Sequence, residues 1–408
     1  MLEASALARL LRDCQPRVLG ALVRRHRDLA ACEDALQEAL LAAVRQWPQT
    51  GVPAQPHAWL LQVASRRCTD AFRSDTSRRD REQRFTEPDA MAPASDDVLE
   101  AARDDSLDLF FHCCQPALTP ASAVALTLRA VGGLTTAELA HAFLVPEATM
   151  GQRLHRARQA VDEAGLRLGE LDEAARAARF PSVMQVLYLI FNEGYAASAG
   201  ASVHRVDLTS EALRLTRLLV KLRPDEPEAL GLLALMLLTD ARRAARTGPG
   251  GELIPLDEQD RARWDQRLIH EGRALLDAAL ERRQPGPYQL QAAIAALHDA
   301  APSTEATDWQ QIAGLYELLL QQGDNPMVRL NLAIARAQLD GPRRGLELLA
   351  ALEGDARLAA HHRFLAAKAH LLDRAGRQAE ASALYLRAAD ATDNDAERAW
   401  LRRRAARA

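Results

Sequence analysis

Polar and basic side chains gather on one face of an expected helix in the first half of the chain. They are Thr149, Gln152, Arg153, His155, Arg156 and Arg158. The apolar residues of the same segment recur at helical spacing and should form a buried stripe on the other face. They are Met150, Leu154, Ala157 and Val161. Arginine and glutamine so placed can donate paired hydrogen bonds to guanine or adenine edges and can neutralise phosphates. The pattern indicates a DNA contact, and a solvated basic face is the alternative.

A second helix is expected directly before this segment. Thr135 and Glu138 form a capping box, in which each side chain satisfies a backbone NH at the helix start, and the helix should end near Phe143. After a tight turn, Pro146 can start the next helix, because its fixed φ suits the first helical position. Two helices joined in this way predict a helix-turn-helix, which strengthens the DNA interpretation.

Two amphipathic helices are expected nearer the N-terminus. In residues 32–47 a core stripe should form from Leu36, Leu40, Ala43 or Val44, and Trp47. Asp34, Gln37 and Glu38 fall on the opposite face of that helix, with Leu41. A Pro-rich loop, Pro48 to Pro56, precedes the second helix, which becomes basic towards its end at Arg66, Arg67 and Arg73.

With these helices in place, the chain resembles the extracytoplasmic-function (ECF) group of sigma-70 transcription initiation factors. DALQEALLAA is similar to their region 2.2, WLLQVASRRCTDAFR to regions 2.3 and 2.4, and LTLRAVGGLTTAELA with LHRARQAV to region 4. The order and spacing of the motifs carry the resemblance. It implies a dissociable RNA polymerase subunit that directs initiation at a limited set of promoters and catalyses nothing itself.

The resemblance implies roles for individual positions. Asp34, Gln37 and Glu38 would bind core RNA polymerase at the clamp coiled coil of its largest subunit. Arg66, Arg67 and Arg73 would engage the −10 element and the opened strand, since unstacked bases need cationic and stacking partners. The polar face of residues 149–158 would enter the major groove at the −35 element. Gly151 and His155 depart from the residues common in the family, so its preferred base sequence is not carried over.

Composition predicts an all-α protein with several domains. Aromatic residues make up 4% of the 408 residues, and alternating strand patterns are nearly absent. The net charge of −4 is distributed unevenly along the chain. Residues 75–108 alone hold eleven acidic residues and five arginines. We expect sigma-70 region 2 over 1–75, an acidic flexible linker over 76–105, region 4 over 106–165 and a helical extension over 170–408. In the family, the equivalent linker threads polymerase channels where nucleic acid otherwise runs.

Cysteine usage and hydropathy predict a cytoplasmic protein without a metal or another cofactor. The five cysteines are odd in number and form no CxxC pair, so neither a disulfide framework nor a zinc site is favoured. His112, Cys113 and Cys114 are the one cluster with metal-ligand chemistry, but no second ligand pair lies nearby. The sequence shows no signal peptide and no apolar run of membrane-spanning length.

The extension should consist of paired amphipathic helices. Six segments have helical periodicity, at residues 210–222, 227–245, 263–280, 288–300, 308–320 and 326–339. Gly341 and Gly376 each end one helix and precede another, and the residues around Gly376 resemble a tetratricopeptide repeat. Such repeats stack into a concave binding surface.

One segment of the extension, Phe191, Asn192, Glu193, Gly194 and Tyr195, follows an apolar run. It is either a helix C-cap, with Gly194 left-handed and Tyr195 packing back, or a contact to the sigma domains or to a ligand. FNEGYAAS with GPYQLQAAIAALH and AFLVPEATM resembles the subgroup of these sigma factors that carries a C-terminal tetratricopeptide-like extension. We therefore expect the extension to contact the sigma domains of the same chain through this segment and to regulate them.

Two other functions remain open from sequence. The chain could be a helix-turn-helix regulator that binds DNA without polymerase and senses a protein or small-molecule effector through its repeats. It could also be an enzyme or adaptor whose extension places Glu193, Tyr195, His298 or His270 in a pocket. The acidic face at Asp34 to Glu38 favours the sigma factor, since an ordinary regulator needs no polymerase surface.

Overall fold

The structure is a computed structural model that describes residues 4–77, 105–143, 145–164, 171–197, 199–200, 203–355, 358–359 and 361–408. It divides into two compact units, Met1–Leu187 and Tyr188–Ala408, hereafter the first and second units. Both are helical, and the strands of the described ranges are two-residue segments, β1 (Ala199–Gly200) and β2 (Asp393–Asn394), paired in parallel within the second unit. The expectation of an all-α protein is confirmed.

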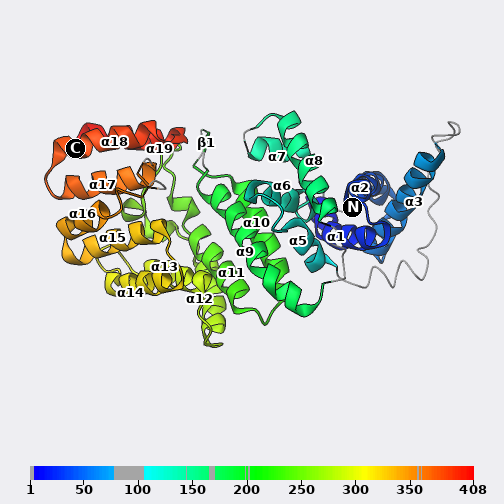
Figure 1. Ribbon diagram of the computed structural model, residues 1–408, viewed down its shortest axis with the longest axis horizontal. Helices are drawn as coiled ribbons and strands as arrows, with labels where there is room; N and C mark the ends of the chain where they lie inside the picture. The colour runs from blue at the N-terminus through cyan, green and yellow to red at the C-terminus, as the bar shows by residue number, and fades with distance from the viewer. Residues whose placement is uncertain are drawn as a thin grey trace. The chain divides into compact units, whose positions relative to one another are not determined.

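In its described residues up to 164, the first unit begins with three long helices and continues with four shorter ones (Figure 1). The long helices are α1 (Ala4–His26), α2 (Leu29–Thr50) and α3 (Pro56–Ser77). The shorter ones are α5 (Ser106–Cys113), α6 (Pro120–Ala130), α7 (Thr136–Ala142) and α8 (Glu147–Glu163). The expected acidic linker lies almost wholly in residues 78–104, outside the described part of the chain.

The expected loop from Pro48 to Pro56 is shorter than the sequence suggested. Helix α2 continues through Pro48 to Thr50, and Gly51, with φ 86°, ends it by donating its NH to the Trp47 carbonyl. A proline in the last helical turn removes one hydrogen bond and leaves the preceding turns intact. The sequence rule that proline breaks a helix therefore placed this boundary too early.

The capping box that opens α7 is confirmed. The Glu138 backbone NH donates to the Thr135 hydroxyl at 3.1 Å, and the Thr135 NH donates to the Glu138 carboxylate at 2.7 Å. Pro146, expected at the first position of the next helix, instead occupies the N-cap of α8 with ψ 144°. Helix α8 therefore begins one residue later than expected, and the helix-turn-helix keeps its form.

Helix α9 (Glu173–Tyr195) spans the boundary between the units. In its first half, Arg176 forms an ion pair with Asp108 of α5 at 3.1 Å. Phe180 packs beside Phe111 of α5, with ring centroids 6.4 Å apart. The first half of α9 therefore belongs to the core of the first unit, while its last turns belong to the second.

The second unit is a succession of helices whose cores follow one another along the chain (Figure 1). Its helices begin with α10 (Val206–Leu222), α11 (Pro227–Asp240), α12 (Gln266–Leu280), α13 (Pro287–Ala300) and α14 (Trp309–Gln322). They continue with α15 (Pro326–Asp340), α16 (Pro342–Ala350), α17 (His362–Arg374), α18 (Gln378–Asp390) and α19 (Asp395–Arg407). Three short 3-10 turns lie between α11 and α12: η1 (Arg243–Ala245), η2 (Leu256–Glu258) and η3 (Arg261–Arg263). All six expected helical segments are present.

Both glycines expected between helices have the left-handed backbone that favours glycine. Gly341 has φ 88° between α15 and α16, and Gly376 has φ 78° between α17 and α18. Tyr385, which the repeat pattern expects inside, is fully buried in a core shared by α15 to α19. Stacked hairpins are compatible with tetratricopeptide-like repeats, an assignment that stays a prediction.

Candidate nucleic-acid interface

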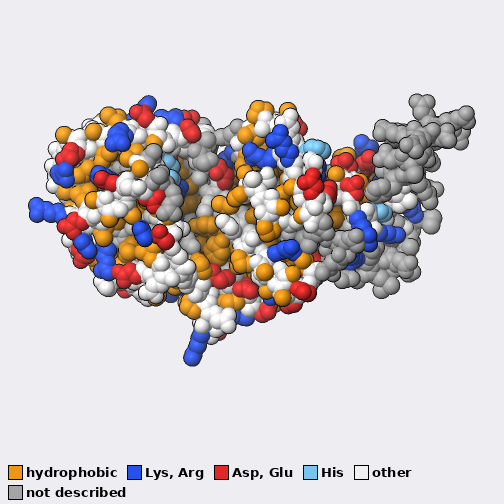
Figure 2. Space-filling model, in the orientation of Figure 1, with side chains coloured by type: hydrophobic (Ala, Val, Ile, Leu, Met, Phe, Trp, Pro, Cys, Tyr) orange, Lys and Arg blue, Asp and Glu red, His pale blue; other side chains and the backbone are white. Residues whose placement is uncertain are grey.

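Helix α8 separates apolar and polar residues as its sequence predicts. Its buried residues are Met150, Leu154, Ala157 and Val161. Its exposed side chains include Thr149, Gln152, His155 and Arg156, while Arg153 is half-buried. In Figure 2, basic side chains gather over the region of α7 and α8. Helix α8 therefore presents hydrogen-bond donors and positive charge along about two of its turns. These groups match the chemistry of duplex DNA.

Arg158 is turned away from this exposed face. Its guanidinium forms an ion pair with Glu33 of α2, which is buried with 3% of its side chain exposed. Arg129 of α6 lies 3.8 Å from the same carboxylate. Burial raises the pKa of Glu33, and the two arginines oppose that rise. Arg158 therefore helps to hold α8 against α2 and is not free to reach a base or phosphate in this arrangement.

A second ion pair also joins helices α1 to α3 to the part of the first unit that begins at Asp105. Arg24 of α1 contacts the carboxylate of Asp105 at 2.8 Å, directly before α5, and that carboxylate is 3% exposed. Gly20 of α1 allows the close approach, because an added Cβ would lie 2.8 Å from the Asp105 Cβ. Sequence reasoning missed Glu33 and Asp105. The signal for Glu33 was its place beside Cys32, three residues before Leu36, where a charge faces the core and needs a partner.

The acidic face predicted on α2 is present. Asp34 and Glu38 are exposed, Gln37 is half-buried, and Leu41 beside them is 57% exposed. An exposed leucine beside carboxylates suits a partner surface that is both basic and partly apolar. The core stripe of the same helix uses Ala43, while Val44 faces solvent.

The predicted −10 residues lie next to this acidic face. Arg67 forms an ion pair with Glu38 at 3.3 Å, and Arg66 is exposed on α3. Trp59 of α3 packs edge-on against Trp47 of α2, with ring centroids 5.4 Å apart. The side chain of Arg73 lies outside the described residues. The structure thus brings the start of the basic stretch and the acidic face together on one helical pair.

The one cluster with metal-ligand chemistry in the sequence lies inside the core. Cys113 and Cys114 are fully buried, and burial lowers the pKa of His112 to about 4, so the imidazole is neutral at pH 7. Within the described ranges, no three His, Cys, Asp or Glu side chains are arranged to hold a metal ion. All five cysteines are buried thiols.

Gly194 does not form the expected left-handed C-cap. Helix α9 runs on through Tyr195, and Gly194 is absent from the residues with positive φ. A Cβ at Gly194 would lie 2.5 Å from the Thr209 backbone nitrogen, and the Arg205 NH donates to the Gly194 carbonyl at 2.7 Å. The glycine is therefore required by the close approach of α10 and not by a reversed backbone.

The other residues of this segment make contacts within the second unit. Tyr195 packs back as expected, since its ring stacks on Phe191 with centroids 5.9 Å apart. The half-buried Arg246 guanidinium lies 4.0 Å from the centroid of the Tyr195 ring and also donates to the Tyr195 carbonyl. Asn192 and Glu193 line a cavity of about 600 Å³ beside Arg246.

The four residues considered for an enzyme site are not gathered in one place. Glu193 and Tyr195 line the cavity beside Arg246, and His298 lines a different one. His270 is exposed on α12 and lines neither. This arrangement gives the enzyme interpretation no common pocket.

Among the described helices, none is long and apolar enough to cross a membrane.

Comparison with known families assigns three parts of the chain. Residues 10–78 match sigma-70 region 2 and residues 111–161 match sigma-70 region 4. Residues 179–280 match a family of unknown function, DUF6596, which includes the segment Phe191–Tyr195. No solved structure matches the chain.

Relatives cover either the whole chain or its sigma regions. An uncharacterised protein of Rhizobium meliloti (strain 1021) is 40% identical over 96% of this chain and 93% of its own length. A probable ECF RNA polymerase sigma factor, SigI, of Mycobacterium tuberculosis is 30% identical over 33% of this chain and 47% of its own length. The RNA polymerase sigma-H factor of Pseudomonas aeruginosa is 29% identical over 37% of this chain and 81% of its own length.

Regions 2 and 4 occur here in the order of a sigma factor, each with the helices its sequence predicts, and a further helical unit follows them. Sigma-70 domains imply core RNA polymerase and promoter DNA as partners. The chain belongs to the extracytoplasmic-function group of the sigma-70 family, with a C-terminal extension that contains the DUF6596 family.

Proposed function

We propose that this sigma factor binds core RNA polymerase through Asp34, Gln37 and Glu38 and reads the −35 element with the exposed face of α8. The observation that carries the proposal is the split of α8 into a fully buried apolar stripe and an exposed face of Thr149, Gln152, His155 and Arg156. Base edges and phosphates are the partners of such a face. Arg66, Arg67 and Arg73 would meet the −10 element.

A promoter contact by Arg158 would require a change in the first unit. Arg158 cannot hold the buried Glu33 carboxylate and contact DNA at the same time. We propose that loading onto polymerase separates region 4 from region 2, breaking the pairs Arg158–Glu33 and Arg24–Asp105. Core polymerase must then supply contacts that compensate for uncovering Glu33, since a buried carboxylate without its partner is costly.

We further propose that the extension regulates this change through α9. The helix is continuous from Arg176, which pairs with Asp108 of α5, to Tyr195, which stacks on Phe191 and receives Arg246. An event in the second unit that moves the end of α9 would act on the contacts of its start. The sequence predicted that Phe191–Tyr195 contacts the sigma domains directly. Because its contacts described here lie within the second unit, we propose that it acts on those domains through α9.

Transcription in vitro tests the proposal. Purified full chain and core RNA polymerase would be incubated with fragmented genomic DNA, and start sites would be mapped. We expect initiation at a limited set of promoters that depends on both components. DNA binding without polymerase, with no start sites in its presence, would support the helix-turn-helix regulator instead.

Truncation tests the regulatory part. A chain ending at Leu187 keeps the first unit and the part of α9 that packs on α5. We expect its transcription to differ from that of the full chain by about tenfold or more, with loss indicating a positioning role and gain indicating inhibition. Equal transcription by both chains would make the extension irrelevant to initiation.

A further inference from the structure

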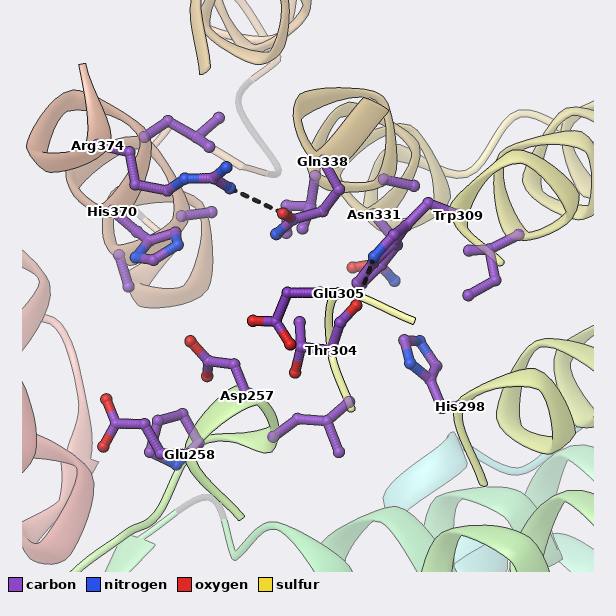
Figure 3. A pocket seen from close by; sticks show the side chains of 18 of the residues that line it. Asp257, Glu258, His298, Thr304, Glu305, Trp309, Asn331, Gln338, His370 and Arg374 are labelled. Carbon is purple, nitrogen blue, oxygen red and sulfur yellow. Dashed lines mark hydrogen bonds between the residues drawn. The ribbon is translucent and has the colours of Figure 1, made fainter. Parts of the chain in front are cut away.

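A cavity of about 900 Å³ lies within the second unit. Its volume is within the range of ligand pockets, roughly 300 to 1,000 Å³. Residues of α14, α15, α17 and α19 form its walls, and the segment from Pro255 to Arg261 closes one side (Figure 3). The cavity is therefore the concave face of stacked hairpins, covered in part by the chain's own loop.

The covering segment is fixed at two points. Glu258 pairs with Arg404 of α19 at 3.4 Å, and Arg404 also pairs with Asp373 at 3.3 Å. Arg261 donates to the carbonyls of His298 and Ala301 after α13. Contacts at both ends hold this wall in place, so the cavity is preformed.

One side of the cavity carries two exposed carboxylates, Asp257 and Glu305, and the charge of Arg261 acts on Glu305. Asp257 and Glu305 point into the same space in Figure 3. Hydrogen bonds from its own backbone and from Ser303 lower the pKa of Glu305 and keep it ionised. Neither carboxylate forms an ion pair with any residue that the structure describes. This side is a negative surface available to a cation.

The opposite side carries a positively charged side chain, Arg374, whose hydrogen-bond partner is a neutral amide. Arg374 donates to the Gln338 amide oxygen at 3.0 Å, and no described carboxylate pairs with it. Asn331 of α15 adds a second amide beside Gln338 (Figure 3). Charge of one sign on each side favours a ligand that carries both signs, because a purely anionic or cationic ligand would be repelled by one side.

Apart from Asp257, Glu305, Arg374 and the wall residues Glu258, Arg261 and Arg404, the lining is aromatic or uncharged. Trp309 and Trp400 line the cavity, and Ile312 and Ile334 add apolar surface. Burial lowers the pKa of His298 to about 3, with Arg242 and Arg261 contributing, so this imidazole is neutral. The lining thus offers surface for an apolar side chain and amides for a backbone peptide group.

We propose that this cavity binds a short peptide with free ends, its ammonium group at Asp257 and Glu305 and its carboxylate at Arg374. Asn331 and Gln338 would hydrogen-bond the peptide backbone, and Trp309 and Trp400 would pack against its side chains. A cation and an anion at the two ends would complement the two carboxylates and Arg374, and neutral side chains would suit the aromatic and apolar lining. This ligand site is separate from the sigma function of the first unit.

Peptide retention by the purified full chain tests the proposal. The probes are an equimolar library of tri- and tetrapeptides with free ends, and the same library acetylated and amidated. Ultrafiltration followed by mass spectrometry measures what the protein retains. We expect free peptides to be retained at least tenfold more than blocked ones. The double variant Asp257→Asn/Glu305→Gln and the variant Arg374→Gln should each lose at least tenfold, while Arg374→Lys keeps part of the retention.

Matched controls lie on the same helices outside the cavity. Asp340→Asn on α15 and Arg403→Gln on α19 alter exposed charges and should leave retention unchanged. Circular dichroism melts of all variants separate lost binding from lost folding. Equal retention of free and blocked peptides, no retention at all, or wild-type retention by a well-folded Asp257→Asn/Glu305→Gln variant would overturn the proposal. Because the assay contains no polymerase, its failure would leave the sigma function untouched.

Discussion

The two units place their charged residues in different ways. In the first, Asp34, Glu38 and Arg156 stand on exposed helix faces. In the second, Asp257, Glu305 and Arg374 point into a cavity that the chain partly covers. Exposed charge on straight helices suits partners that are large and charged, such as duplex DNA. Charge on the walls of a concavity suits a small ligand. We therefore expect the two helical units of this chain to bind two classes of partner.

The largest effect should come from the acidic face of α2. Reversing both charges, Asp34→Arg with Glu38→Arg, should abolish association with core polymerase, because a basic partner surface would then be repelled. Glu38→Arg also opposes Arg67, its present ion-pair partner. Pull-down of core enzyme measures the effect. The matched control reverses two exposed carboxylates of the second unit, Glu281→Arg with Asp340→Arg. Equal recovery of core enzyme by both double variants would remove the polymerase assignment.

Single substitutions of two arginines on α8 should separate an effect on stability from an effect on promoter recognition. Arg158→Ala leaves Glu33 buried without its closest partner, so the first unit should lose about 3 kcal/mol of stability, as breaking buried pairs does. Arg156 is exposed, and Arg156→Ala should leave stability unchanged. It should instead lower discrimination between promoters by about 1 to 3 kcal/mol, the value of a bidentate base contact.

Urea unfolding and promoter competition measure the two losses. A destabilised Arg156→Ala, or an Arg158→Ala that unfolds at the wild-type midpoint, would show that the two residues are wrongly assigned. Full promoter preference in Arg156→Ala would remove the −35 assignment of the exposed face.

Sequence predicted the first unit well because its signals are local. The capping box at Thr135 and Glu138 and the buried stripe from Met150 to Val161 each depend on residues within one or two helices. Helical periodicity and capping report such short-range chemistry directly. What it missed, the pair of Glu33 with Arg158, joins residues 125 positions apart, and no periodicity encodes that distance.

The second unit shows the same limit more strongly. Its helices were predictable, but one of the two interpretations of residues 191–195 gave Gly194 a reversed backbone, while the structure uses its missing side chain to admit Thr209. A glycine near a helix end has both uses, and sequence does not say which neighbour approaches. The cavity is likewise built by residues from Asp257 to Arg404 that share no motif.

Acidification should destabilise the second unit more than the first. Burial lowers the pKa of His112 to about 4 in the first unit, and it lowers those of His204 and His298 to about 4 and about 3 in the second. An unfolded histidine titrates near 6.5. Between pH 6.5 and 4 the unfolded chain binds more protons, so the free energy of unfolding falls as pH falls. Across this pH window each histidine contributes at most about 3 kcal/mol, since one pKa unit corresponds to roughly 1.4 kcal/mol, and the partly exposed His204 contributes less because solvent screens it.

Hydrogen exchange followed by mass spectrometry resolves the two units in the intact chain. As the pH is lowered from 6.5 to 4, amides of α11 to α13 should lose protection before those of α5 and α6. His298→Gln should reduce the difference, whereas His270→Gln, at an exposed position of α12, should not. Simultaneous loss of protection in both units would contradict the assignment of the buried histidines.

The smallest effects compare one helical glycine from each unit. Gly151 of α8 has open space where a Cβ would lie, so Gly151→Ala should stabilise the helix by up to about 1 kcal/mol. Gly194 of α9 has the Thr209 backbone nitrogen 2.5 Å and its hydroxyl oxygen 2.6 Å from that position. Gly194→Ala must push α10 away or bend α9, and overpacking of this kind costs about 1 to 3 kcal/mol. The urea midpoints of the two variants should therefore shift in opposite directions.

Because α9 continues into the contact of Arg176 with Asp108, Gly194→Ala should also alter transcription if the end of α9 acts on its start. A destabilised Gly194→Ala variant that transcribes as wild type would show that the two ends of α9 are independent.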